Sequence, residues 1–340
     1  MAAGSRGRPE HAAGDAAVGP GAAAARERAR YDCREMTNAT TSRSHLFRRR
    51  VASPARRPVA SAAWRDVEPD VLAPVVLVAG GFLAMPGWYE GLAAGLRKRG
   101  VADVLVAPVY PPDWILAAAR GLGPITTRVG RALLEAGVRS AELPTSRGAP
   151  VLFVGHSGGG LIGRLLTSPV PFEGRTLRAA GRIGALVTLG TPNAAGLATS
   201  DGGRWGRRVG EAGTRFAERH VPGATFAPTT GYVSVASRLL VGRLRTEDGR
   251  EQFVRRLYED VYPQPDLDTV AGDGLVPVAA ALLPGSHEIV LAGAVHAPGS
   301  STAWYGAGAN LDAWWPVALD AWREALRARL ATGPAPSRRA

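Results

Sequence analysis

Val151-Leu-Phe-Val-Gly-His-Ser157-Gly-Gly-Gly160 joins an apolar run to a Gly-x-Ser-x-Gly turn, and the apolar segment 161–166 follows directly. This order predicts a strand, a tight turn and a helix. The glycines permit a strained turn and let the helix pack closely against the strand. Such a nucleophile elbow lifts a serine hydroxyl clear of a sheet, where a base and backbone amides can activate it. Ser157 is therefore the predicted nucleophile.

The five-residue pattern alone is weak, because glycine fills 43 of 340 positions and chance matches are common in such a chain. Two later loops support it. Asp273 lies in Ala271-Gly-Asp-Gly-Leu-Val-Pro277, and His296 lies in Gly293-Ala-Val-His-Ala-Pro298. The α/β-hydrolase fold imposes the order serine, acid, histidine, with acid and base on loops after late strands. We therefore predict Asp273 as the acid, with Asp268 as the alternative, and His296 as the base.

Backbone amides would hold the negative charge that develops on the substrate oxygen. The amide of Gly158 follows the nucleophile, and Gly81 lies in the turn after the first predicted strand, where this fold builds its oxyanion hole. Phe82 is the alternative to Gly81. His156 is interpreted as a packed polar residue, because its side chain leaves the backbone beside that of Ser157 and does not face it.

Short apolar runs alternate with helical periodicity along residues 66–332, which predicts one α/β domain. The predicted strands are residues 75–79, 104–107, 151–154, 185–189, 232–236 and 288–291, and the predicted helices are residues 88–99, 125–136, 161–167, 250–261 and 310–331. They describe a mostly parallel central sheet with helices on both faces. The site then belongs at the carboxyl ends of the strands.

Residues 191–230 follow a predicted strand but show poor periodicity. The segment is either a cap over the site or an ordinary helical excursion. Its aromatic residues Trp205, Phe216 and Phe226, together with Phe82, are predicted to contact an apolar acyl group. Its arginines predict weak attraction to a membrane surface without insertion.

With these residues in place, the chain resembles a lipase-like serine hydrolase of the α/β-hydrolase superfamily. It most resembles the plant and cyanobacterial branch, on the patterns Gly272-Asp-Gly-Leu-Val-Pro277, His296-Ala-Pro298 and Trp304-Tyr-Gly306. Further matches are Pro111-Pro-Asp-Trp114 and Leu189-Gly-Thr-Pro192. The resemblance covers residues 74–315 and implies the α/β-hydrolase fold and hydrolysis of a carboxylic ester. Asn193 departs from the pattern, since lipases often have histidine there.

The positive charge is concentrated in the N-terminal arm. Residues 1–65 contain 13 arginines and 5 acidic residues, which leaves 28 basic and 24 acidic residues in the other 275. From Met36 to Arg65 the arm has six Ser or Thr residues before Pro54 and no Asp or Glu. This composition is typical of an organelle transit peptide, with residues 59–63 as the cleavage site. It predicts a plastid protein; a mitochondrial protein, or a cytoplasmic bacterial protein with a disordered tail, is the alternative. Residues 333–340 are predicted to be a disordered tail.

Several functional classes are disfavoured. The near-neutral body does not indicate nucleic-acid binding. The histidines show no ligand spacing, so we predict no metal and no cofactor. Pro74, Gly80, Gly81, Pro86 and Gly87 interrupt the uncharged run 71–89, which argues against a transmembrane helix. Dinucleotide binding would require an acidic residue at the end of the strand 185–189, and none is present.

The sequence therefore predicts a serine hydrolase acting on a small-molecule or lipid ester. Thioesterase and acyltransferase chemistry remain alternatives because all three use one acyl-enzyme. A non-catalytic scaffold on the same fold is the third alternative.

Overall fold

Six short strands rich in β-branched residues form the centre of the protein. The computed structural model describes residues 63–176, 178–194, 205–299 and 302–333, all within one compact unit that comprises residues 59–340. The strands are β1 (Val75–Ala79), β2 (Asp103–Val106), β3 (Val151–His156), β4 (Ile183–Leu189), β5 (Gly231–Ser237) and β8 (His287–Leu291). They pair in parallel in the order β2-β1-β3-β4-β5-β8. This confirms the predicted parallel sheet of the α/β-hydrolase fold.

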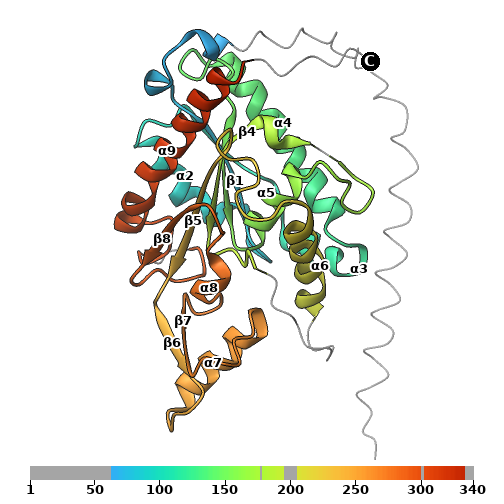
Figure 1. Cartoon of the computed structure of the whole chain (residues 1–340), viewed down its shortest axis with the longest axis vertical. Helices are drawn as coiled ribbons and strands as arrows, with labels where there is room; N and C mark the ends of the chain where they lie inside the picture. Colours follow the sequence, from blue (N-terminus) through green and yellow to red (C-terminus); the bar gives the residue numbers. More distant parts are fainter. Residues whose placement is uncertain (1–62, 177, 195–204, 300–301, 334–340) are drawn as a thin grey trace, which may run out of the picture. The chain divides into compact units, whose positions relative to one another are not determined.

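Alternate residues of each strand enter two different cores, as the pleat of a strand requires. Val76 and Val78 face one core together with α2 (Glu90–Arg97) and α9 (Gly308–Ala331). Val75 and Leu77 face the other, which also takes residues from α3 (Pro111–Arg120), α4 (Gly123–Glu142), α5 (Gly158–Thr167) and α6 (Trp205–His220). The sheet is therefore covered on both faces, as Figure 1 shows.

Short 3₁₀ helices connect several of these elements. They are η1 (Ala63–Asp66), η2 (Pro69–Val71), η3 (Pro86–Tyr89) and η4 (Ala179–Arg182). The predicted helix 88–99 is thus divided into η3 and α2. The sequence analysis missed α3, because its first residues, Pro111 and Pro112, suggest a turn. Proline is nevertheless favourable in the first turn of a helix, and the Asp113 carboxylate accepts the amide of Tyr110 at 2.9 Å to complete the cap.

A smaller unit lies between β5 and β8. It contains the antiparallel pair β6 (Leu240–Arg243) and β7 (Thr269–Gly272), together with α7 (Gly249–Val261) and α8 (Val278–Ala281). Arg255 of α7 is buried and donates to the carbonyls of Gln264 and Leu267 at 2.7 and 2.8 Å. These bonds fix the segment that leads into β7. Asp273 follows β7 directly, so this unit determines where the predicted acid lies.

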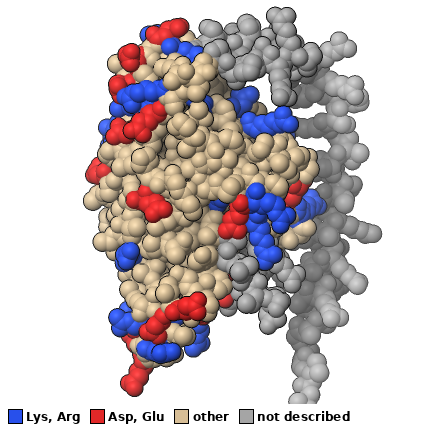
Figure 2. All heavy atoms as spheres, viewed as in Figure 1, with Lys and Arg blue, Asp and Glu red and all other residues tan. Residues whose placement is uncertain are grey.

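Several sequence predictions lie outside the described residues. These are the arm up to residue 62 with most of the cleavage site, residues 195–204 of the predicted cap, and the tail from residue 334. Within the described part of the chain, no helix combines the length and the apolar character that crossing a bilayer requires. On the face that Figure 2 shows, the described basic side chains are interspersed with acidic ones.

Candidate active site

Ser157 lies at the sharp turn between β3 and α5. Its backbone adopts φ 51° and ψ −127°, a region that costs a non-glycine residue about 1–3 kcal/mol. The close approach of strand and helix enforces this turn, since a Cβ on Gly155 would lie only 2.3 Å from the Cα of Gly160. The Ser157 amide donates to the carbonyl of Leu189 at 2.9 Å. The result is the elbow that the sequence predicts.

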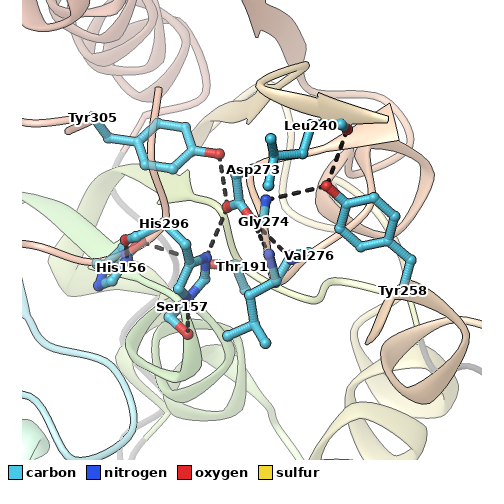
Figure 3. Close-up of polar contacts among 12 residues, drawn as sticks. His156, Ser157, Thr191, Leu240, Tyr258, Asp273, Gly274, Val276, His296 and Tyr305 are labelled. Atoms are coloured by element: carbon cyan, nitrogen blue, oxygen red, sulfur yellow. Dashed lines mark hydrogen bonds and ion pairs between the residues drawn. The ribbon is translucent and has the colours of Figure 1, made fainter. Parts of the chain in front are cut away.

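Three side chains from separate loops meet at this turn (Figure 3). The Nε2 atom of His296 lies 3.1 Å from Ser157 Oγ, and its Nδ1 atom lies 2.7 Å from Asp273 Oδ2. Ser157 follows β3, Asp273 follows β7 and His296 follows β8. The structure therefore brings together all three residues that the sequence analysis selected. Asp268 is exposed and accepts the amide of Arg245 at 3.1 Å, so it does not contact His296.

The Asp273 carboxylate is fully hydrogen-bonded. Its Oδ1 atom accepts the amides of Leu275 and Val276 at 3.0 and 2.7 Å, and its Oδ2 atom accepts the Tyr305 hydroxyl at 2.9 Å as well as His296. Burial alone raises the pKa of Asp273, but the bonds and charge of His296 and the two amides lower it below its ordinary value. The group therefore stays ionised in a buried site.

Tyr305 is a site residue that the sequence analysis did not identify. Burial and the neighbouring Asp273 charge raise its pKa, so its hydroxyl remains protonated and donates to the carboxylate. Tyr305 lies in the Trp304-Tyr-Gly306 pattern, which was recognised as a family feature without a role. The pattern was therefore the signal, but a contact between residues 32 positions apart requires the fold.

The predicted oxyanion donor Gly81 needs correction. Its amide donates to the Tyr89 hydroxyl at 3.0 Å, so it is already used. Gly81 has another role, because a Cβ there would lie 2.6 Å from the Cβ of Ser157. Within the described residues, the amide of Phe82 has no acceptor, and that of Gly158 opens α5, where no preceding turn supplies one. Phe82 and Gly158 are therefore the candidate donors.

The aromatic residues predicted to contact substrate lie in different places. The Phe82 ring packs edge-on against Trp114 with centroids 5.8 Å apart, and Trp114 in turn lies against Gly158. Phe216 instead packs on Phe172, beyond the C-terminal end of α5.

Phe226 packs against the core that also contains residues of α3, α4, α5 and α6. It lies in the loop that enters β5 at the amino edge of the sheet. The predicted contact of Phe216 and Phe226 with substrate was wrong. The connection from β4 to β5 contains α6, which packs along α5, and both residues lie in the part of it that runs toward the start of β5. Figure 1 shows α6 beside α3 on this route. Trp205 begins α6, and its side chain lies outside the described part.

A buried chain of hydrogen bonds, called the relay below, connects Tyr89 through His156 to the backbone of His296. His156 Nδ1 is 2.9 Å from the Tyr89 hydroxyl, and His156 Nε2 is 2.9 Å from the carbonyl oxygen of His296. Burial, and then the nearby His296, lower the pKa of His156 to about 3. The interpretation of His156 as a packed polar residue agrees with its burial, but its two hydrogen bonds were not anticipated.

The neutral state of His156 has a measurable consequence for stability. Its pKa is lower in the folded than in the unfolded chain, so the unfolded chain binds the extra proton between about pH 6.5 and pH 3, and stability falls as pH falls through this window. As pH falls, the free energy of unfolding of the wild-type protein should therefore decrease by up to about 1.4 kcal/mol per pH unit more than that of a His156→Phe variant. Urea unfolding of both proteins at pH 7, 6, 5 and 4 measures the difference. Parallel curves would show that His156 is not held neutral.

Among the described residues, no group of three or more His, Cys, Asp and Glu side chains is arranged to hold a metal ion. The arrangement around Ser157 brings together a serine hydroxyl, an imidazole, a buried carboxylate and the amides of Phe82 and Gly158. Those are the components of acyl transfer by a serine.

Comparisons with known proteins do not assign the chain to a family. No family model matches the chain, and no curated protein matches it. Among solved structures, apo esterase 2 from Thermogutta terrifontis is 13% identical over 79% of this chain and 84% of its own, with a TM-score of 0.39. The RedJ thioesterase of the prodiginine pathway in Streptomyces coelicolor is 18% identical over 83% and 99%, with a TM-score of 0.32. The chain spans 42% of the length of the pyrethroid hydrolase PytH, at 17% identity over 36% of this chain and a TM-score of 0.26.

Proposed function

We propose that the protein is a serine hydrolase that cleaves carboxylic esters through an acyl-enzyme intermediate. The observation that carries this proposal is the unbroken hydrogen-bonded chain from Ser157 Oγ through His296 to Asp273. It starts at a serine held in a strained elbow. A structural serine has no need of this strain or of a buried, ionised acid behind its histidine partner.

The reaction follows from the donors and acceptors. Ser157 Oγ attacks the acyl carbon while His296 Nε2 takes its proton, and the carbonyl oxygen becomes an oxyanion held by the amides of Phe82 and Gly158. When the oxyanion collapses, the C–O bond to the leaving group breaks, and His296 returns the proton to the departing alcohol. A water molecule then attacks the acyl-enzyme, with His296 again as base, and releases the acid and Ser157.

Asp273 performs an electrostatic role in both steps. Its Oδ2 atom accepts a hydrogen bond from Nδ1–H of His296, so Nε2 carries no proton and can act as base, and its charge stabilises the imidazolium that forms. The Tyr305 hydroxyl and two amides hold the carboxylate in this orientation. Asp273 therefore supports the proton transfers without itself becoming protonated.

The surface next to the site favours an apolar acyl group. The loop after β1 and the start of α3 expose large apolar side chains: Phe82, Leu83, Met85, Trp88, Tyr110, Ile115 and Leu116. Trp114 connects this group to the elbow, since it lies between Phe82 and Gly158. Burial of each additional acyl methylene against such a surface contributes about 0.8 kcal/mol. This patch replaces Phe216 and Phe226 as the candidate contact for the acyl chain.

An acyl-length series tests this proposal. We expect kcat/KM of the full chain for p-nitrophenyl hexanoate to exceed that for the acetate by about 10-fold or more. Phe82→Ala should reduce this ratio, because it removes apolar surface while leaving the amide in place. Phe253→Ala is the matched control, since Phe253 is also an exposed phenylalanine and lies on α7.

Two outcomes would change the proposal. No turnover of any ester by the folded protein contradicts ester hydrolysis, and a preference for acetate contradicts the apolar acyl group. Thioesters of the same acyl groups should be measured in parallel. A higher kcat/KM for the thioester would reassign the leaving group to a thiol, with the same triad.

A further inference from the structure

The elbow residue before the nucleophile connects two parts of the site that are far apart in sequence. His156 bonds through Nδ1 to the Tyr89 hydroxyl and through Nε2 to the carbonyl of His296. The Tyr89 hydroxyl oxygen also accepts a hydrogen bond from the amide of Gly81. The relay therefore runs from Gly81, beside the candidate oxyanion donor Phe82, to the peptide of the candidate base.

Only one assignment of protons satisfies every member of this relay. A carbonyl accepts only, so His156 Nε2 must carry a proton and donate to His296. The ring is neutral, which leaves Nδ1 as an acceptor for the hydroxyl proton of Tyr89. The hydroxyl oxygen is then free to accept the amide of Gly81. Both nitrogens of His156 are used, so it is not a second base for Ser157.

Burial makes this relay rigid. Tyr89 is 0% and His156 2% exposed, so water does not compete for their bonds. The His156 ring also contacts the rings of Tyr89, His296 and Trp304, with centroids 5.8, 5.0 and 5.7 Å apart. Loss of one member would leave a buried polar partner unsatisfied, which in a core is more costly than the bond itself.

The His296 peptide is held from both sides. Its amide donates to the carbonyl of Asp273 at 3.2 Å, and its carbonyl accepts from His156 at 2.9 Å. Its ring bonds to Asp273 and to Ser157. The acid therefore fixes one side of the base, and His156 fixes the other.

We propose that His156 and Tyr89 are positioning residues that hold the base His296 and the oxyanion loop, which contains Gly81 and Phe82, in their positions relative to Ser157. Neither touches the reacting atoms. Each acts through a backbone group, Gly81 at one end and His296 at the other. The inference rests on the proposed function, in which Phe82 and His296 act on the same substrate carbonyl.

Kinetics of three variants test this role. Tyr89→Phe and His156→Phe should each lower kcat about 10- to 100-fold with KM within about 2-fold, because a small displacement of donor or base affects the transition state more than substrate binding. The double variant should lose no more than the more impaired single variant, since both changes break one chain. Affinity for a boronic acid inhibitor, which forms a tetrahedral adduct on serine, should fall in parallel with kcat.

Tyr232→Phe is the matched control. Tyr232 is a buried tyrosine on β5 whose hydroxyl bonds to the backbone of Phe226, away from the elbow. It should lose stability to a similar degree and keep its kcat. Equal kcat in Tyr89→Phe and Tyr232→Phe, at equal folded fraction, overturns the positioning role.

A spectroscopic readout separates this inference from the proposed function. The downfield proton resonance of His296 Nδ1–H, bonded to Asp273, reports the orientation of the base without any substrate. It should shift or broaden in both relay variants and stay unchanged in Tyr232→Phe. An unchanged resonance overturns the inference even if His156→Phe folds poorly, because Tyr89→Phe removes a single oxygen atom. Absence of ester turnover in the wild-type protein overturns the proposed function alone.

Discussion

Replacement of Ser157 by alanine should lower kcat for ester hydrolysis by about 10⁵- to 10⁶-fold, the largest loss expected from any single change in this chain. Without Oγ no acyl-enzyme forms, and His296 has no proton to accept. The amides of Phe82 and Gly158 remain, so a small rate above that in water should persist. Stopped assays with p-nitrophenyl hexanoate and labelling by a fluorophosphonate probe both measure the effect.

The fold should survive this change, because the hydroxyl contacts His296 at the elbow and does not fill a core. Ser168→Ala is the matched control: it removes a buried hydroxyl at the end of α5, whose bonds are local to Val170. It should retain labelling and kcat. Covalent labelling of the Ser157→Ala protein at the wild-type rate would assign the nucleophile to another residue.

The sequence was sufficient to predict the sheet and the meeting of Ser157, Asp273 and His296, because both leave local signals. The strands are apolar runs bounded by helical stretches, and the elbow places its glycines at fixed distances from Ser157. His296 lies shortly after the predicted strand 288–291, and Asp273 lies in the Gly272-Asp-Gly-Leu-Val-Pro277 pattern between the last two predicted strands. Once the parallel order is assumed, the carboxyl ends of the strands bring these loops to one edge.

Of the two oxyanion donors that the sequence offered after β1, Gly81 and its alternative Phe82, the structure favours Phe82, for a reason that the sequence does not show. Gly81 fits an oxyanion loop because glycine permits a close approach of the backbone, and Gly81 does lie close to Ser157. However, its amide donates to the hydroxyl of Tyr89, eight residues later in η3. Only the structure shows that this amide is bonded to Tyr89, whereas the amide of Phe82 has no acceptor in the part of the chain that the structure describes.

The misplaced aromatic residues illustrate a second limit. Phe216 and Phe226 belong to a connection between adjacent strands, and such a connection must leave the carboxyl edge and return to the amino edge. The sequence does not mark where along residues 191–230 that descent occurs. In the structure α6 already packs along α5, so both residues lie beyond the site. The β6 and β7 pair escaped prediction because its strands, Leu-Val-Gly-Arg and Thr-Val-Ala-Gly, are only partly buried and contain no continuous apolar run.

Asp273→Asn should lower kcat by about 10³- to 10⁴-fold, less than removal of His296 and far more than removal of any other carboxylate. The local hydrogen bonds explain the size. The amides of Leu275 and Val276 require an acceptor, so the Asn oxygen should occupy the Oδ1 position and its amide nitrogen should face His296. Nδ1 of His296 must then accept a hydrogen bond from this amide nitrogen, which places the ring proton of His296 on Nε2. A base protonated at Nε2 can no longer take the proton of Ser157.

Asp268→Asn provides the matched control for this change. It makes the same substitution at an exposed carboxylate that bonds to the Arg245 amide. Surface substitutions usually change stability by no more than about 0.5 kcal/mol, and Asp268 does not contact His296, so kcat should stay close to that of the wild type. The tautomer of His296, read from the ¹⁵N shifts of its ring, should switch in Asp273→Asn only. A large loss of kcat without this switch would mean that Asp273 acts through its charge alone. Equal losses in the two variants would contradict the assignment of Asp273 as the acid, because only Asp273 contacts the base.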